Sequence, residues 1–240
     1  MKGYKDYGII FKQININEVD RIVSILTKYH GRVDSIAKGI RKISSRKSGS
    51  IDIMNLSYFY FNKGKNFDYI IEVKLINNFS NLKLNLKSLF NLFYICELLD
   101  NFIKTSDKQP EIFLLTLSLL KFIHSNNKEI IIRSYELKLL ALLGYRPNLY
   151  TCLKCNKKFK KHELRYLSNE YIGFICCNNK KPKNDISSKS IKIMRYLLNS
   201  NLSQAQKIII DKNTLRDIKY INNFWIECII EKNLNSIKFI

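Results

Sequence analysis

Residues 51–75 read IDIMNLSYFYFNKGKNFDYIIEVKL, and this stretch decides the fold class of the first part of the chain. Two runs rich in aromatic and β-branched residues, Ile51–Phe61 and Asp68–Leu75, predict strands, because such side chains pack well on a half-buried pleated surface. The turn-forming residues NKGK at 62–65 separate the runs and predict a β-hairpin. Alternate strand residues face opposite sides, so we expect most of the aromatic residues at 58–61 to pack inward, although some are candidates for stacking on bases.

Three further runs precede this hairpin and predict strands at Tyr7–Gln13, Arg21–Tyr29 and Arg32–Lys38. His30-Gly31 is expected to make the turn between the second and third of them. Five strands without a convincing long helix predict a small barrel over residues 1–77. A five-stranded OB-type barrel fits this count, and an SH3-like barrel fits the strand count equally well.

The apolar spacing changes to three and four residues from Asn81 onward, which predicts helices. Gly144 and the Arg146-Pro147 pair are expected to end this helical part, and the helical spacing resumes from Ser187. We therefore expect an α+β protein with an OB-fold nucleic-acid-binding domain at 1–77 and a helical domain at 78–240, the latter with a cysteine-bearing insertion at 150–183. The apolar positions that carry this prediction are Leu82, Leu86, Leu89, Phe90, Phe93, Leu98, Phe102, Ile112, Leu115, Leu119, Phe122, Leu137, Leu140, Leu143, Ile191, Met194, Leu197, Leu198, Leu215, Ile218, Ile221, Trp225 and Ile229.

The composition excludes an intrinsically disordered chain, because 46% of the 240 residues are hydrophobic and only 25% are charged. Lys and Arg outnumber Asp and Glu by 41 to 20, a formal net charge of +21, which makes nucleic acid the leading partner. A chain rich in Lys, Asn and Ile gains basic residues from an AT-rich genome, so the distribution of the charge is more informative than its sum.

The basic residues gather in one strand and loop of the first domain. Between Lys28 and Gly49 only Asp34 is acidic, and glycines and serines accompany the basic residues. Such a loop can follow phosphates with its cations, hydroxyls and backbone N–H groups, although a solvated loop without a ligand is the simpler alternative. The candidate nucleic-acid-binding residues are Arg32, Lys38, Arg41, Lys42, Arg46 and Lys47.

A second candidate site is formed by cysteines. Cys152 and Cys155 have the spacing of a zinc knuckle, and Cys176 and Cys177 follow about twenty residues later. Because adjacent side chains diverge in extended backbone, Cys177 ligates the same zinc only from a turn, and His162 is an alternative fourth ligand. A knuckle that folds without metal also remains open. Cys96 and Cys228 stand alone in apolar surroundings and are expected in the core.

No enzyme signature is found in the sequence. It has no Walker A, G-x-G-x-x-G or G-x-S-x-G motif, and its histidine and cysteines are in the wrong order for a zinc deaminase. We therefore expect no enzymatic activity, and we expect His30 and His124 to have roles at a turn and a helix end. The sequence has no signal-peptide pattern and no long apolar span, which predicts a cytoplasmic, nucleoid-associated protein without a membrane partner.

Three motifs together resemble the RecO family of bacterial recombination-mediator proteins. They are YGIIFKQ at 7–13, TKYHGRV at 27–33 followed by AKGIRKISSRKSG at 37–49, and LLGYRPNLYTCLKC at 142–155. The resemblance implies an N-terminal OB-fold and a helical domain with an inserted zinc segment. The resemblance also implies roles for individual residues. The residues implied to bind DNA are Lys38, Arg41, Lys42 and Arg46, and those implied to bind zinc are Cys152, Cys155 and Cys176. The fourth zinc position does not match, so Cys177 or His162 replaces it or the metal has been lost.

The resemblance also implies a function and partners. Members of the family are expected to bind single- and double-stranded DNA, to anneal strands coated by single-strand-binding protein and to act with RecR in loading RecA. They are further expected to bind the C-terminal tail of single-strand-binding protein through the helical domain. The composition alone equally permits a basic RNA-binding or transcription-associated protein. A metal-dependent nuclease is a third and weak hypothesis, because the clustered carboxylates that such enzymes need are missing from the sequence.

Overall fold

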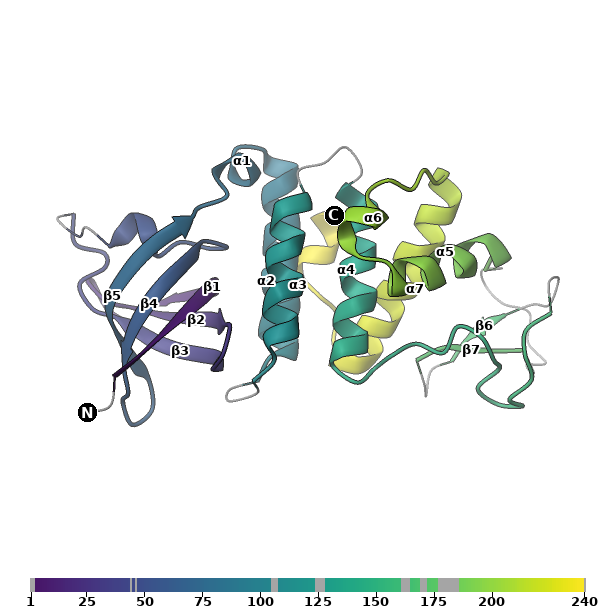
Figure 1. Ribbon diagram of the computed structural model, residues 1–240, viewed down its shortest axis with the longest axis horizontal. Helices are drawn as coiled ribbons and strands as arrows, with labels where there is room; N and C mark the ends of the chain where they lie inside the picture. The colour runs from purple at the N-terminus through teal and green to yellow at the C-terminus, as the bar shows by residue number, and fades with distance from the viewer. Residues whose placement is uncertain are drawn as a thin grey trace. The chain divides into compact units, whose positions relative to one another are not determined.

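The computed structural model describes residues 3–43, 45, 47–104, 108–123, 128–160, 165–168, 172–176 and 186–239, without the side chains of Lys128 and Phe239. The chain divides into two compact units (Figure 1), the first made of Met1–Leu117 with Leu234–Ile240 and the second of Ser118–Asn233. The predicted change from strands to helices at 77/78 coincides with the end of the last barrel strand, and the first unit continues beyond that point into the helical part, as far as Leu117. The domain boundary at that position stays a prediction.

The first unit is built on five strands, β1 (Gly3–Asn15), β2 (Arg21–Thr27), β3 (Gly31–Ala37), β4 (Leu56–Asn62) and β5 (Asp68–Asn77). They form a closed barrel in the order β1-β2-β3-β5-β4, in which β1 pairs with both β2 and β4. All neighbours are antiparallel except β3 and β5, which pair in parallel through Ser35–Asp68 and Ile36–Tyr69. This order and the helices that follow confirm the predicted α+β fold with a five-stranded OB-type barrel.

Side chains alternate between the two faces of β4, which explains how the aromatic run fills the core of the barrel. Phe59 and Phe61 point inward and are completely buried, whereas Tyr58 and Tyr60 are half-buried on the other side of the strand. The two phenylalanines stack with ring centroids 5.3 Å apart. They belong to a core of small and β-branched residues completed by Ile10, Val23, Ile25, Val33, Ala37, Ile40, Ile51 and Ile70.

Most strand ends differ from the prediction: β1 is longer at both ends, β2 ends two residues earlier, β3 is shifted by one residue, β4 begins and ends later and β5 ends later. Two of these differences have a clear local cause. The turn between β2 and β3 occupies residues 28–30, because the Thr27 hydroxyl donates to the Gly31 carbonyl at 2.7 Å and accepts from the His30 N–H at 3.1 Å. β4 begins at Leu56 instead of Ile51, after a 3-10 helix (Ser48–Ser50) and a turn. There the Asn55 side chain donates to the carbonyls of residues 49 and 50, which holds the chain in a turn rather than a strand.

The barrel is followed by α1 (Ser80–Lys83), α2 (Leu86–Phe102), α3 (Pro110–Phe122) and α4 (Lys128–Leu142), where three helices were expected. α1 and α2 belong to the first unit, α3 crosses the division at 117/118, and α4 belongs to the second unit. The first predicted stretch is interrupted at Asn85, whose side chain accepts from the N–H groups of Lys87 and Ser88 and so starts α2 as an N-cap. α4 ends two residues before Gly144, which has a φ of +90°. The predicted stop at this glycine is confirmed.

The second unit packs α4 against α5 (Ser188–Asn199), α6 (Leu202–Ala205) and α7 (Lys212–Ile230). Trp225 and Met194 are completely buried in its core. Arg133 and Glu136 form a buried ion pair of 2.8 Å, and the Glu136 carboxylate also accepts from the Asn222 amide. In the described part of the cysteine-bearing segment, the short strands β6 (Tyr166–Leu167) and β7 (Phe174–Ile175) pair antiparallel.

The two isolated cysteines differ in burial. Cys96 lies in α2 and is buried, as expected. The prediction for Cys228 is wrong, because this residue is exposed at the margin of the buried face of α7, whose centre is formed by Ile218, Ile221 and Trp225. Within the described residues, no helix combines the length and the apolar character needed to cross a bilayer.

Candidate nucleic-acid interface and metal centre

The basic loop that follows β3 is fixed at its base by the turn between β1 and β2. Gly39 has a φ of +64°, a backbone conformation that favours glycine, and its N–H donates to the Asp20 carboxylate at 2.7 Å. Arg41 donates through its backbone N–H to the Val19 carbonyl and through Nη1 to the Asn17 carbonyl, at 3.0 and 2.6 Å. The first half of the loop is therefore an ordered structure rather than a free tether.

Asp20 is the acidic residue that organises this base. The Gly39 N–H, the Asn17 amide and the nearby charges of Lys38 and Lys42 hold the pKa of its carboxyl below the usual range, against a smaller opposing effect of burial. The carboxylate therefore stays ionised, and continues to accept the Gly39 N–H, at a lower pH than an aspartate without these neighbours would.

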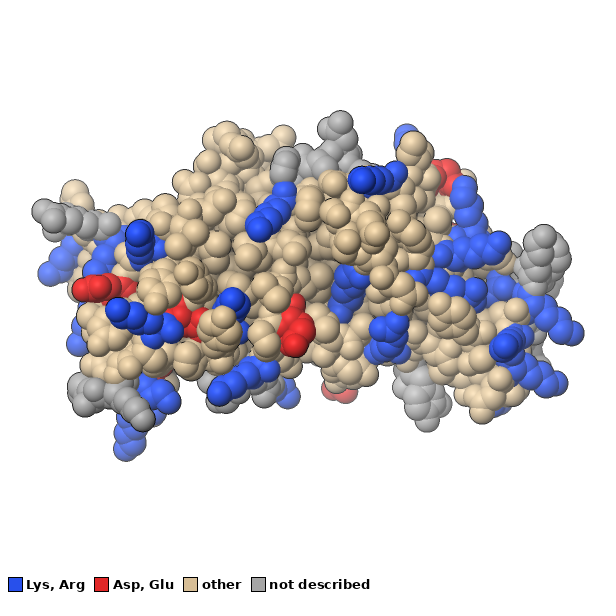
Figure 2. Space-filling model, in the orientation of Figure 1, with Lys and Arg blue, Asp and Glu red and all other residues tan. Residues whose placement is uncertain are grey.

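The predicted phosphate-binding side chains of the loop differ in their surroundings. Lys38, Arg41 and Lys42 are exposed, and the Lys38 Nζ lies 4.9 Å from the centre of the Tyr69 ring. Lys47 is half-buried and donates to the Ile71 carbonyl, and Arg46 lies outside the described residues. On the face that Figure 2 shows, Lys and Arg side chains outnumber acidic ones over both units.

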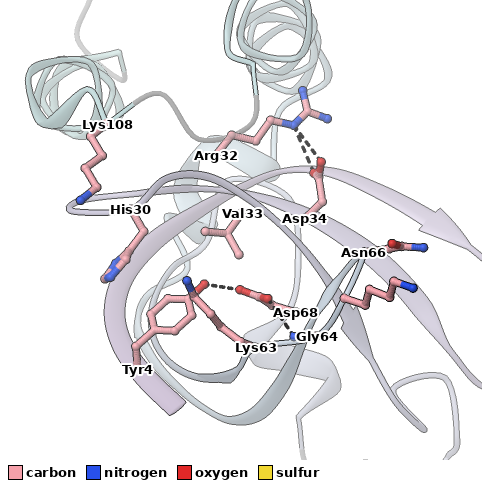
Figure 3. Close-up of a pocket in the computed structure, with 11 residues that line it drawn as sticks. Tyr4, His30, Arg32, Val33, Asp34, Lys63, Gly64, Asn66, Asp68 and Lys108 are labelled. Atoms are coloured by element: carbon pink, nitrogen blue, oxygen red, sulfur yellow. Dashed lines mark hydrogen bonds and ion pairs between the residues drawn. The ribbon is translucent and has the colours of Figure 1, made fainter. Parts of the chain in front are cut away.

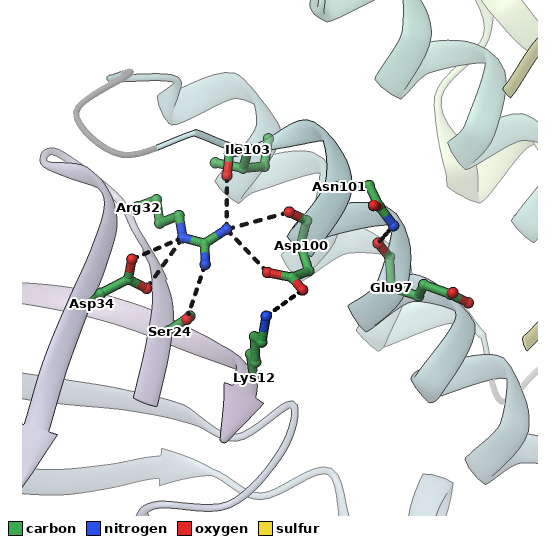
Figure 4. Close-up of polar contacts among 8 residues, drawn as sticks. All are labelled: Lys12, Ser24, Arg32, Asp34, Glu97, Asp100, Asn101 and Ile103. Atoms are coloured by element: carbon green, nitrogen blue, oxygen red, sulfur yellow. Dashed lines mark hydrogen bonds and ion pairs between the residues drawn. The ribbon is translucent and has the colours of Figure 1, made fainter. Parts of the chain in front are cut away.

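Arg32, the sixth candidate, is held inside the first unit. Its guanidinium turns toward Asp34 (Figure 3) and is surrounded by acceptors (Figure 4). Nε donates to Asp34 at 3.1 Å, Nη1 donates to the Ile103 carbonyl at 3.0 Å, and Nη2 donates to the Ser24 hydroxyl at 3.2 Å. Only 14% of the side chain is exposed, and Nη1 also pairs with Asp100. These contacts make Arg32 a structural residue that joins β3 to α2.

The cysteine-bearing segment brings three of its four predicted ligands together. The Sγ atoms of Cys152, Cys155 and Cys176 all lie within 4.8 Å of one another, and those of Cys155 and Cys176 are 3.5 Å apart. Cys177 and the alternative ligand His162 lie outside the described residues, as does His124. Sequence spacing therefore located three cysteines that the structure brings close enough to share a metal ion.

Backbone N–H groups surround the Cys152 sulfur. Those of Lys154, Cys155 and Cys176 lie 3.4, 3.5 and 3.3 Å from Sγ. Burial raises the pKa of the Cys152 thiol, whereas the hydrogen bonds donated to its sulfur lower the pKa. The lowering effect is the larger of the two, so the pKa falls to about 6. The arrangement favours a thiolate at this position.

The donor set fits a zinc ion. Thiolates bound at about 2.3 Å in a tetrahedron lie roughly 3.8 Å apart. The 3.5 Å between the Sγ atoms of Cys155 and Cys176 is close to this separation, and the Sγ of Cys152 lies within 4.8 Å of both. Three sulfur ligands at such distances suit a structural site, which needs one further ligand from the segment. The three cysteines can therefore hold a metal ion.

Sequence reasoning missed a group of lysines in the first unit, two in the turn between β4 and β5 and one just before α3. Lys63, Lys65 and Lys108 surround a pocket that His30 and Tyr4 also line (Figure 3). The NKGKN turn at 62–66 carries a sequence signal for this group, because it places one lysine on each side of a glycine. By itself, however, this spacing indicates only a hairpin turn. His30 has the expected turn position, and it additionally donates through Nδ1 to the Asp6 carboxylate at 2.7 Å.

Comparison with known proteins identifies the family. A family model described as Recombination protein O N terminal matches residues 1–79, and one described as Recombination protein O C terminal matches residues 84–238. The chain belongs to the RecO family. The predicted resemblance is thereby confirmed, and the two matched regions meet close to the end of β5.

Individual relatives are similar over most of their length. A DNA repair protein RecO of Dehalococcoides mccartyi is 30% identical over 232 residues, which cover 95% of this chain and 91% of the relative. A DNA repair protein RecO of a Thermoanaerobacter species is 31% identical over 216 residues, which cover 87% of this chain and 85% of the relative. A third, of Desulforamulus reducens, is 26% identical over 241 residues, covering 100% and 94%. The RecO similarity thus extends through the barrel, the helices and the cysteine-bearing segment.

Proposed function

We propose that the chain is a non-catalytic DNA repair protein that binds single- and double-stranded DNA. In this proposal it anneals complementary strands coated by single-strand-binding protein and helps RecR to load RecA at the nucleoid. The observation that carries the proposal is the ordered basic loop after β3, on a barrel of the OB type, in a chain whose relatives are named DNA repair proteins.

The loop suits phosphates better than base edges. Lys38, Arg41 and Lys42 are exposed cations on a backbone that Asp20 and Val19 hold in place. Cations of this kind neutralise phosphates and release counterions, which gives affinity without sequence preference. Arg32 is left out of the proposed interface, because its donors are engaged within the first unit.

The proposed annealing follows from charge. Two complementary strands repel each other as polyanions, and a carrier of formal charge +21 lowers this repulsion while it leaves the base edges free to pair. Such a protein needs neither a nucleophile nor a reaction-centre metal. It accelerates the encounter of two strands rather than a bond-breaking step.

The cysteine cluster supports a structural zinc site in the same proposal. Cys152, Cys155 and Cys176 would hold the ion, with Cys177 or His162 as the fourth ligand. A bound zinc ion cross-links the segment and contributes directly to its folding. The residues themselves already arrange three N–H groups around the Cys152 sulfur, which holds the first ligand in position.

A salt titration of DNA binding tests the proposed interface. In the variant Lys38→Ala/Arg41→Ala/Lys42→Ala, we expect weaker binding to unrelated sequences, and a plot of log affinity against log salt that is flatter by about 0.9 for each duplex phosphate that the variant no longer neutralises. Lys5→Ala/Lys74→Ala/Lys87→Ala removes equal charge from exposed positions outside the loop and is the matched control. An unchanged slope in the loop variant would exclude the loop as the interface.

Two further arms separate this proposal from its alternatives. Preferential binding to structured RNA over DNA of equal length would favour an RNA-binding or transcription-associated protein. Cleavage of DNA that depends on an added divalent metal would indicate a nuclease. We expect neither result.

A further inference from the structure

A pocket of about 430 Å³ opens on the barrel beside the turn between β4 and β5. Tyr4 of β1, His30 before β3 and Asp68 at the start of β5 line it, together with Lys63 and Lys65 of the turn (Figure 3). Its volume is within the range of small-ligand sites, and most of its lining is polar or charged. Among the described residues that line the pocket, none belongs to the basic loop at 38–47 or to the cysteine cluster. The sites described above therefore assign the pocket no role.

Aromatic rings lead from the barrel core to this pocket. Phe59 stacks on Phe61 at 5.3 Å, Phe61 stacks on Tyr4 at 5.0 Å, and the Tyr4 and His30 ring centroids are 4.4 Å apart. The two phenylalanines are completely buried, whereas 37% of the His30 side chain is exposed. The row of rings therefore ends at the surface with a ring that can take one further planar partner.

The two outer rings are fixed in place. Asp6, whose side chain is completely buried, accepts from His30 Nδ1 at 2.7 Å and from the Tyr29 N–H at 2.9 Å. The Tyr4 hydroxyl donates to Asp68, and burial followed by this hydrogen bond raises the pKa of Tyr4. An anchored ring loses little conformational freedom when a ligand stacks on it.

The rim of the pocket is cationic. Lys63, Lys65 and Lys108 are exposed. Of the two acids in the lining, Asp34 is paired with Arg32, and Asp68 accepts from Tyr4 and from the Gly64 N–H. The three lysines therefore surround an aromatic surface with positive charge that the neighbouring acids do not fully neutralise.

We propose that this pocket holds one unstacked nucleotide of single-stranded DNA, with its base on the His30 ring and its flanking phosphates at Lys63, Lys65 and Lys108. The proposal rests on the DNA-binding function proposed above. A base–aromatic stack together with cations that follow the backbone is the usual means of binding single strands without sequence preference. In a duplex each base is already stacked and paired, so this pocket serves single strands alone and gives the barrel a means of distinguishing them.

The contribution of the base is measured with two single strands of equal length, one of thymidines and one of abasic nucleotides. For the unaltered protein we expect at least about fivefold tighter binding of the thymidine strand, since a stacked base contributes on the order of 1 kcal/mol or more. In His30→Asn we expect this ratio to approach one. Asparagine places an N–H near the position of Nδ1, so the hydrogen bond to Asp6 is kept while the ring is removed.

A charge variant provides a second measurement that does not depend on the histidine. In Lys63→Ala/Lys65→Ala we expect the salt slope for single strands to fall by about 0.7 for each phosphate that is no longer neutralised, with duplex affinity no lower than in the control Lys5→Ala/Lys74→Ala. All four lysines are exposed, so both variants should fold.

The outcomes separate the pocket from the proposed function. Equal affinity of the unaltered protein for thymidine and abasic strands would overturn the nucleotide pocket and leave DNA binding by the loop intact. An equal loss of single-strand and duplex affinity in Lys63→Ala/Lys65→Ala, beyond that of its control, would show that the lysines belong to a general phosphate surface and would also overturn it. Failure of the protein to bind any DNA would instead refute the proposed function.

Discussion

The Nη1 atom of Arg32 lies 3.1 Å from the Asp100 carboxylate, so a basic residue of β3 is joined to a helix of the same unit. The same carboxylate accepts from Lys12 of β1 at 2.7 Å (Figure 4). Asp100 thus connects two barrel strands to α2. Arg32 therefore differs from Lys38 and Lys42 of the same basic segment: its side chain is mostly buried and paired, whereas the two lysines are exposed.

The first prediction is that Arg32→Ala destabilises the first unit and leaves DNA affinity at moderate salt nearly unchanged. Loss of the mostly buried guanidinium leaves Asp34 and Asp100 without their shared partner. This should lower the free energy of unfolding of the first unit by about 2–3 kcal/mol. Hydrogen exchange of the barrel amides measures this cost. Lys38→Ala is the matched comparison, with the opposite expectation of normal stability and weaker DNA binding. A flatter salt slope in Arg32→Ala, at unchanged stability, would contradict the structural role.

The second prediction concerns pH and the base of the loop. The pKa of Asp20 is lower in the folded protein than in the unfolded chain, so its stabilising contribution is complete above the unfolded pKa and is lost as the pH falls through the folded pKa. We expect the amide signal of Gly39 to titrate with a midpoint below about 3.9. In Asp20→Asn this acid titration should disappear and the Gly39 amide should exchange faster with solvent. A Gly39 amide that does not respond to pH below 5 would refute the anchor.

The third prediction is that the cysteine-bearing segment depends on a metal. Purified protein should contain about one zinc ion per chain, and a chelator or Cys152→Ser should increase hydrogen exchange between Leu149 and Cys176. The barrel amides should stay protected. Cys96→Ser is the control, because this buried thiol lies outside the cluster. Zinc-free protein with a fully protected segment would favour a knuckle that folds without metal.

The fourth prediction concerns the acidic tail of single-strand-binding protein. We expect the chain to bind this tail through residues 78–240, with an affinity that falls as salt rises, because charge attraction speeds the encounter. Removal of the last residues of the tail should abolish recruitment to coated single strands and spare binding to naked DNA. Equal loss of both activities would mean that the tail and the DNA share one site.

The barrel was predictable because its signals are local. Alternation in β4 and the NKGK turn at 62–65 specify a hairpin from neighbouring residues, and the family motifs agree with the strands that the spacing indicates. The strand ends were less predictable. The Thr27 hydroxyl stops β2 by accepting from and donating to the turn, and this is a contact of one side chain that no periodicity encodes.

The site was predictable only where spacing alone defines it. The interval from Cys152 to Cys155 predicts that the two thiols can share a metal ion, and the structure places Cys176 beside them, as expected. Arg32 could not be distinguished from Lys38 in the sequence, because its partner Asp100 is 68 residues away. The position of His30 beside Tyr4 likewise depends on the pairing of β1 with its neighbours.

The annealing of complementary strands coated by single-strand-binding protein tests the central claim most directly. Fluorophores at the two strand ends report duplex formation as energy transfer, with the unaltered protein, Lys38→Ala/Arg41→Ala/Lys42→Ala and the charge-matched control compared at one salt concentration. The account predicts that the unaltered protein and the control accelerate annealing well above the rate without protein, and that the loop variant does so far less. Acceleration by the loop variant equal to that of the unaltered protein, or no acceleration by any of the three, would contradict it.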